Sequence, residues 1–182
     1  MRLLLDGSFL EGVIALYDDT QVIKEEKVAL GPLANEDLAV YLEKYLKEDV
    51  TGLALGIGPG SYTGMRVAAS LILPLAYVKK IPLMTFCSLQ GISTTSKVVA
   101  DGKRGMFYTL NEGNLRILPL SELPHTFVSP QPLKEIYPAL EGYQIEHSPF
   151  KTEHLLTYLK KKWEEQAFVS PLQVKLNYLV EV

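Results

Sequence analysis

The chain has 182 residues, of which 47% are hydrophobic, and its formal net charge is −3 at pH 7. This length and hydrophobic content exclude a disordered chain and allow a buried core, in one globular unit or in two small lobes. The mild acidity gives no general attraction to nucleic acid or anionic membranes, and the single cysteine excludes an intramolecular disulfide.

The N-terminal segment predicts a cytoplasmic protein. It begins with a strand-like stretch that reaches Asp6, without the basic region and long apolar segment of a signal peptide. The longest apolar stretch, residues 67–78, contains Pro74 and is far shorter than the roughly 20 residues that cross a bilayer. We therefore expect no contact with a membrane.

The first residues predict a strand meander. Residues 2–8 and 12–17 form two apolar strands around a turn, and the sequence Asp6-Gly7-Ser8 supplies the turn chemistry. Residues 21–29 are more polar and predict a third strand at an edge. An amphipathic helix is then expected over residues 35–47, with Asn35 as its N-cap.

A glycine-rich stretch at residues 55–66 separates two apolar segments of different length. Residues 50–57 have the length of a buried strand, and residues 65–78 are long enough for a helix that is buried on most of its surface. Between them, glycines allow a tight turn, and Ser61 or Thr63 can cap the first N–H groups of the helix.

Glycine loops before a helix can hold phosphate, so two known patterns are relevant. The P-loop pattern requires Lys followed by Ser or Thr after its last glycine, whereas Gly64 is followed by Met65 and Arg66. The dinucleotide pattern fails because no third glycine stands at the required place. Loop chemistry alone favours a packing turn over a ligand cradle.

The same stretch carries a more specific resemblance. Residues 56–66, GIGPGSYTGMR, resemble the signature of the TsaB family, formerly YeaZ. Residues 81–89 stand where that family has its next strand, and residues 101–108, DGKRGMFY, are similar to its Asp-Ala-Arg-Arg-Gly-Glu-Val-Tyr segment. The family is a subunit of the bacterial machinery that makes threonylcarbamoyladenosine next to the tRNA anticodon.

The second half of the chain repeats the plan of the first. Residues 98–102 and 106–110 form a strand, an Asp-Gly turn and a second strand, as residues 3–7 and 13–17 do, and residues 115–118 add a third strand. A short helix is expected at 132–137, a short strand at 143–145 and an amphipathic helix at 151–166. The apolar face of that last helix consists of Leu155, Leu156, Leu159 and Trp163.

Two copies of a β-β-β-α-β-α plan indicate an α/β fold of the duplicated actin-like (ASKHA, ribonuclease H-like) type, which the resemblance also implies. We expect a first lobe at residues 1–94 and a second, shortened lobe at residues 95–182. The polar stretch 94–97 marks the boundary between them.

The aspartates of two Asp-Gly turns are the candidate catalytic or metal-binding residues. Asp6 and Asp101 match the places where active actin-like proteins position nucleotide phosphates and metal, but ordinary hairpin turns are the favoured interpretation. His125, His147 and His154 lack the spacing of metal ligands and are expected at the surface. We therefore predict no catalytic, cofactor-binding or metal-binding residue.

The resemblance implies a non-catalytic subunit that forms a homodimer when alone and activates TsaD. TsaD joins threonylcarbamoyl to adenosine in tRNA with the help of the ATPase TsaE, so the chain would meet tRNA only through the complex. The alternative is a small actin-like phosphotransferase or hydrolase that works at Asp6 and Asp101, which ATP binding with turnover would reveal.

In the TsaB family the helices of the first lobe form the partner surface. Here these are residues 35–47 and 61–79, and the second of them is apolar nearly all the way round, so one side is expected to meet another chain. Arg66 lies in this helix and is expected to anchor a glutamate of the same chain or of a partner. The predicted interface residues are Leu38, Leu42, Tyr62, Met65, Arg66, Ala69, Ile72 and Leu73.

Overall fold

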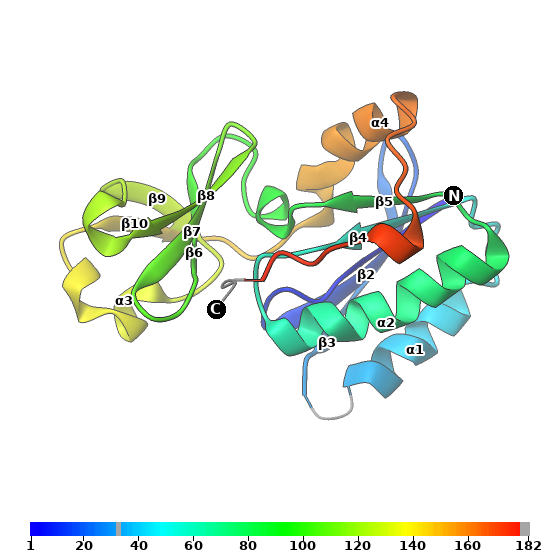
Figure 1. The fold of residues 1–182 in the computed structure, drawn as a ribbon, viewed down its shortest axis with the longest axis horizontal. Coiled ribbons are helices and arrows are strands. Elements are labelled where there is room, and N and C mark those ends of the chain that lie inside the picture. Colours follow the sequence, from blue (N-terminus) through cyan, green and yellow to red (C-terminus); the bar gives the residue numbers. More distant parts are fainter. Residues whose placement is uncertain (32–33, 179–182) are drawn as a thin grey trace.

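Each of two lobes is built on a five-stranded mixed sheet in the computed structural model, which describes residues 1–31 and 34–178 (Figure 1). The strand order is β3-β2-β1-β4-β5 in the first sheet and β10-β9-β6-β7-β8 in the second. This arrangement confirms the predicted duplicated α/β fold.

The first lobe follows the predicted β-β-β-α-β-α order. Its elements are β1 (Arg2–Asp6), β2 (Glu11–Tyr17), β3 (Val22–Ala29), α1 (Ala34–Tyr45), β4 (Gly52–Gly56), α2 (Tyr62–Lys79) and β5 (Leu83–Phe86). β1 pairs antiparallel with β2 and parallel with β4, so it is central and must be buried on both faces. Leu3 and Leu5 accordingly pack toward α1 and α2, while Leu4 packs on the opposite side of the sheet.

The predicted N-cap residue is correct for α2 and wrong for α1. Ser61 is the N-cap of α2, because its Oγ accepts a hydrogen bond from the N–H of Gly64 at 3.2 Å. α1 begins at Ala34, so Asn35 lies inside the helix and is not its cap. Pro74 also lies inside α2, which nevertheless continues to Lys79.

The second lobe starts with the predicted meander and ends with a parallel pair. The connection to it contains η1 (Ser88–Gly91), and its own elements are β6 (Val98–Asp101), β7 (Met106–Asn111), β8 (Asn114–Pro119), η2 (Leu120–Glu122), β9 (Thr126–Ser129), α3 (Leu133–Ile136), η3 (Pro138–Leu140) and β10 (Gln144–His147). β9 was not predicted, because it is only 4 residues long and prolines stand close on both sides. It supplies the parallel partner of β10.

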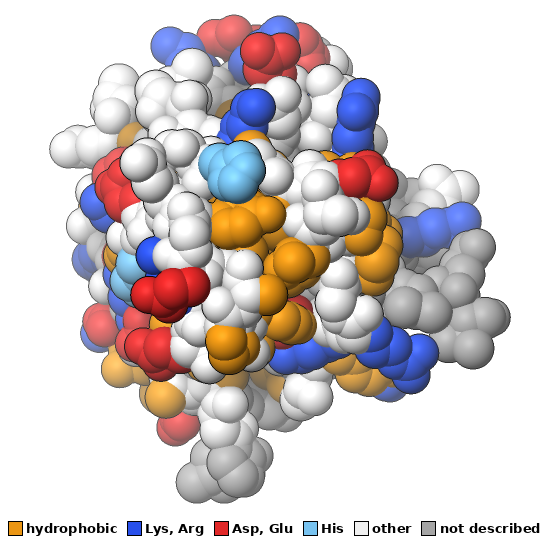
Figure 2. Space-filling view, turned by 90° about the vertical axis from the view of Figure 1, so that its left-hand side faces the viewer, with side chains coloured by type: hydrophobic (Ala, Val, Ile, Leu, Met, Phe, Trp, Pro, Cys, Tyr) orange, Lys and Arg blue, Asp and Glu red, His pale blue; other side chains and the backbone are white. Residues whose placement is uncertain are grey.

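The outer end of the second lobe has little helical cover. Where the first lobe has α1 and α2, the second has α3 with 4 residues. Figure 2 views this end and shows hydrophobic side chains gathered near its centre, between scattered charged groups. Ile117 and Ile136 are the large exposed hydrophobic residues of β8 and α3.

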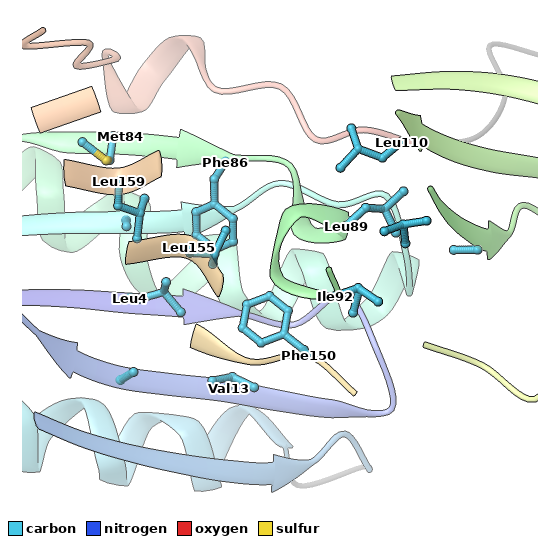
Figure 3. Packing of buried hydrophobic residues seen from close by; sticks show 14 of the residues in the cluster. Leu4, Val13, Met84, Phe86, Leu89, Ile92, Leu110, Phe150, Leu155 and Leu159 are labelled. Atoms are coloured by element: carbon cyan, nitrogen blue, oxygen red, sulfur yellow. The ribbon is translucent and has the colours of Figure 1, made fainter. Parts of the chain in front are cut away.

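The chain then returns to the first lobe. The helix predicted at 151–166 is present as η4 (Thr152–Leu155) and α4 (Leu156–Glu164), followed by η5 (Pro171–Gln173). Its apolar face packs on the first sheet, where Leu155 and Leu159 join the cluster that contains Leu4 and Phe86 (Figure 3). Residues 152–164, which were expected in the second lobe, thus cover one face of the first sheet, which needs an apolar cover.

Candidate functional site

The glycine loop after β4 is held by internal hydrogen bonds. Gly58 N–H donates to the Oγ of Ser88 at 3.0 Å, and Ser88 N–H donates to the carbonyl of Gly58 at 2.8 Å. Ser61 N–H donates to the carbonyl of Ser8 at 2.6 Å. These donors serve the fold and not a phosphate, as a packing turn requires.

Close approach explains two glycines of this region. A Cβ added to Gly7 would lie 2.2 Å from the carbonyl oxygen of Gly64, and one added to Gly60 would lie 1.9 Å from that of Ser8. The turn after β1 therefore rests directly against the glycine loop and the first turn of α2, where no side chain fits.

Asp6 is buried behind this turn, with 1% of its surface exposed. One carboxylate oxygen accepts a hydrogen bond from Ser8 N–H at 2.7 Å, and the other accepts from the hydroxyl of Ser88. Ser8 Oγ in turn lies 2.7 Å from Ser88 Oγ. Burial raises the pKa of Asp6, although the hydrogen bonds from both serines oppose the rise.

Asp101 ends β6 in the corresponding turn of the second lobe. Its Oδ1 accepts from Lys103 N–H and from the Tyr137 hydroxyl, both at 2.7 Å, and its Oδ2 lies 2.8 Å from Lys103 Nζ. Burial by itself raises the pKa of Asp101, but the hydrogen bonds from Lys103 and Tyr137 outweigh it, so the pKa is lowered. The side chain is 1% exposed and fully engaged.

A cleft of about 680 Å³ lies between the two turns. Ser8, Gly60 and Ser61 line it from the first lobe, and Asp101 and Lys103 line it from the second. Asp6 lies behind this lining, because its oxygens turn to Ser8 and Ser88. Over residues 1–31 and 34–178, no three His, Cys, Asp or Glu side chains gather as metal ligands would.

The histidines take no part in the cleft lining. His125 and His147 are exposed, as predicted, and His125 stacks on Tyr143 with 4.7 Å between the ring centroids. His154 is half-buried, and its Nδ1 lies 3.1 Å from the carbonyl oxygen of Gly91.

Several predicted interface residues belong to the core of the first lobe. The buried ones are Leu38, Leu42, Met65, Ala69 and Ile72, with at most 8% of the surface exposed. Their burial in the core leaves them little surface to offer a partner, whereas the prediction placed them at an interface. The reason is helical periodicity: positions 65, 68, 69, 72 and 76 form one inward stripe of α2, which the sheet and α1 cover.

The outward stripe of α2 holds the remaining predicted residues and some that were missed. Tyr62 is 56% exposed, Arg66 is exposed and Leu73 is half-buried. Tyr77, 60% exposed on the same stripe, and Val40, 65% exposed on α1, were not predicted. No signal in the sequence separates these outward positions from the inward ones, because α2 is apolar on nearly every side.

Arg66 is turned toward its own helix neighbour. Its Nη1 donates to the Tyr62 hydroxyl at 2.7 Å, and its guanidinium carbon lies 5.2 Å from the centroid of that ring. In the part of the chain that the structure describes, no carboxylate forms an ion pair with Arg66. A glutamate anchored within the chain is therefore not seen, whereas a partner's glutamate stays a prediction.

Comparison with known proteins shows which family the chain matches. Residues 29–136 match the family described as "TsaD: tRNA N6-adenosine threonylcarbamoyltransferase". The "tRNA threonylcarbamoyladenosine biosynthesis protein TsaB" of Bacillus subtilis (strain 168) is 30% identical over 69 residues. That alignment covers 34% of this chain and 30% of the relative, so it spans less than a third of the curated protein.

Two solved structures from Pseudomonas aeruginosa share the fold. "YeaZ" superimposes with a TM-score of 0.75 at 20% identity, covering 98% of this chain and 100% of the other. An "uncharacterized protein with similarity to peptidase YEAZ" gives a TM-score of 0.74 at 19% identity, covering 99% and 100%. Among the helices of the described residues, none has the length and hydrophobicity to cross a membrane.

Proposed function

The chain belongs to the TsaD family of tRNA N6-adenosine threonylcarbamoyltransferase proteins, as a member of TsaB (YeaZ) type, and from this premise we propose that it is a non-catalytic subunit for threonylcarbamoyladenosine formation. It dimerises when alone and activates a TsaD-like subunit, which transfers threonylcarbamoyl to adenosine next to the anticodon. A TsaE-like ATPase and the tRNA join through the complex.

The state of the two Asp-Gly turns carries this proposal. A carboxylate that binds metal or activates a nucleophile must present an oxygen to its substrate. Both oxygens of Asp6 accept hydrogen bonds from within the fold, and those of Asp101 are taken by Lys103 and Tyr137. Both carboxylates thus hold their own turns together, which supports a structural role for them.

The exposed side of the two first-lobe helices supports the partner role. Val40 of α1 and Tyr62 and Tyr77 of α2 are large, mostly exposed hydrophobic side chains on these neighbouring helices. Large exposed apolar and aromatic side chains on one side of a domain are typical of a protein interface. We call this surface, made of Val40, Tyr62, Arg66, Leu73 and Tyr77, the helix-pair surface.

The cleft keeps the alternative open, a small phosphotransferase or hydrolase that uses Asp6 and Asp101. Its volume of about 680 Å³ would admit a small molecule. Asp101 lies in its lining, but with the side chain 1% exposed.

Reconstitution distinguishes the two functions. We expect the organism's TsaD-like and TsaE-like proteins, supplied with tRNA, ATP and an activated threonylcarbamoyl donor, to form threonylcarbamoyladenosine at a measurable rate only when this chain is added. Mass spectrometry of tRNA digests measures the product. Full activity without the chain would contradict the proposal. ATP turnover by the chain alone, lost in Asp101→Asn, would establish the alternative.

A further inference from the structure

The residues after α4 form a C-terminal strap along the first lobe, defined here as residues 166–178 (Figure 1). Val169 N–H donates to the carbonyl of Leu83 at 2.8 Å, which attaches the strap to the edge strand β5. Val174 and Leu176 pack against the hydrophobic cluster of α1, α2 and the first sheet. The strap is thus a fixed part of the fold up to its end.

Asn177 places the end of the strap between the lobes. Its N–H donates to the carbonyl of Ile57 in the glycine loop at 2.8 Å, and its own carbonyl accepts from the Tyr108 hydroxyl at 3.4 Å. The second bond is long for an O–H donor, so the bond to the glycine loop provides most of the restraint. With its neighbour held in this way, Tyr178 has a defined position.

The Tyr178 ring packs on Tyr62, at the end of the helix-pair surface where both residues also line the cleft between the lobes. Its centroid is 4.8 Å from that of Tyr62 at an interplanar angle of 42°, and Tyr62 accepts the hydrogen bond from Arg66. Burial and the nearby Tyr62 raise the pKa of Tyr178, while Arg66 opposes the rise, as expected for a compact cluster. We call Tyr62, Arg66 and Tyr178 the aromatic clamp.

We propose that Tyr178 is a recognition residue of the partner surface, and that the aromatic clamp binds a carboxylate flanked by apolar side chains on the partner subunit. This inference rests on the proposed function. The guanidinium of Arg66 uses one donor for Tyr62, and the described residues provide no ion pair for the others. α2 itself contains no Asp or Glu that would compete for the site.

The chemistry of the clamp favours a carboxylate over other groups. A planar guanidinium presents paired donors that match the two oxygens of a carboxylate, and ring contacts keep it pre-organised. Tyrosine and arginine together are enriched among the residues that dominate protein interfaces. Tyr178, 41% exposed, adds apolar area beside the charge and reduces its contact with water.

Binding of the full-length chain to the TsaD-like subunit, measured by calorimetry, tests the inference. We expect Tyr178→Ala to weaken binding about tenfold, which corresponds to about 1.4 kcal/mol. Tyr178→Phe keeps the ring and should stay within about twofold of the unaltered chain. Leu172→Ala is the matched control, because Leu172 lies in the same strap and is 77% exposed.

A double-substitution cycle provides the second readout. If Tyr178 acts through the clamp, Tyr62→Ala combined with Tyr178→Ala should weaken binding by less than the product of the two single effects. Circular dichroism and thermal unfolding must show that each variant is folded. If Tyr178→Ala and Leu172→Ala both bind as tightly as the unaltered chain, the inference is overturned and the proposed function stays intact. If the unaltered chain does not bind, the proposed function fails and the inference fails with it.

Discussion

Asp6 and Ser88, 82 positions apart in the chain, share a buried hydrogen bond that joins the end of β1 to the start of η1. Ser88 also accepts from Gly58 N–H at 3.0 Å, so the pair links three segments: the first turn, the glycine loop and the connection to the second lobe. The carboxylate that resembles a catalytic group by position therefore has a structural role.

Asp6→Asn is expected to leave modified-tRNA formation within a few-fold of the unaltered rate. The amide keeps a carbonyl oxygen for Ser8 N–H, and it removes a charge whose burial is unfavourable. The measurement is threonylcarbamoyladenosine formed per minute by the reconstituted proteins. A loss of about 100-fold in a folded variant, typical of removing a catalytic group, would favour the enzyme alternative.

The contribution of Asp6 to stability should fall as pH rises, whereas a carboxylate whose pKa is lowered by folding contributes more as pH rises. Because the folded state has the raised pKa, the protonated form of Asp6 contributes stability below the unfolded value of 3.8, and this contribution is lost as pH rises through the folded pKa. The melting temperature of the unaltered chain relative to Asp6→Asn should therefore fall as pH rises from about 4.

Asp18 provides the control for this experiment. Hydrogen bonds from Thr20 and Gln21 lower its pKa, so its contribution is present above 3.8 and is lost as pH falls through the folded pKa. The chain relative to Asp18→Asn should gain stability over the same rise in pH. Equal slopes for the two variants would show that the fold does not raise the pKa of Asp6.

The order of elements and the glycine turn could be predicted from the sequence because they depend on local signals. Asp-Gly pairs, strand-length apolar runs and the Ser61 cap act over a few residues. The face of each helix could not be predicted in the same way. α2 is apolar on nearly every side, so its periodicity does not distinguish the side that packs on the sheet from the side that meets solvent.

The destination of the last helix escaped prediction for a related reason. The apolar face of α4 that carries Leu159 indicates that the helix packs on another apolar surface. The sequence does not indicate which of the two sheets provides that surface. The contact of Trp163 with Tyr17, an Nε1 to hydroxyl hydrogen bond of 3.2 Å, joins residues 146 positions apart. Such a contact leaves no local trace in the sequence.

Ile72→Ala is expected to lower the free energy of unfolding by about 2–5 kcal/mol, because it opens a cavity in a closely packed core. Ile72 is 0% exposed between the sheet and α1. Denaturant titration measures the free energy of unfolding, and Ser70→Ala, at an exposed position two residues away, should change it by less than about 0.5 kcal/mol. Equal midpoints for both variants would mean that α2 does not pack as described.

Binding of tRNA to the isolated chain should be no better than nonspecific, with a dissociation constant of roughly 10⁻⁴ to 10⁻⁶ M at physiological salt. The net charge is −3, and basic residues occur only in short clusters such as Lys79-Lys80 and Lys103-Arg104, so the electrostatic attraction to RNA should be weak. Filter binding or fluorescence anisotropy with an unmodified transcript measures it. Nanomolar binding by this chain alone would contradict the proposal that it contacts tRNA only through the complex.

Tyr77→Glu and Val40→Glu should abolish dimerisation and weaken binding to the TsaD-like subunit while the chain stays folded. Both side chains are at least 60% exposed, so a charge there costs little in the monomer, but an interface would bury it without a counter-ion. Ile136→Glu is the matched control, at a residue 47% exposed on α3 of the other lobe. Analytical ultracentrifugation gives the oligomeric state, and calorimetry gives the affinity for the partner. If both variants keep full dimerisation and full partner binding, the helix-pair surface is not the interface, and the partner role must be sought on another face.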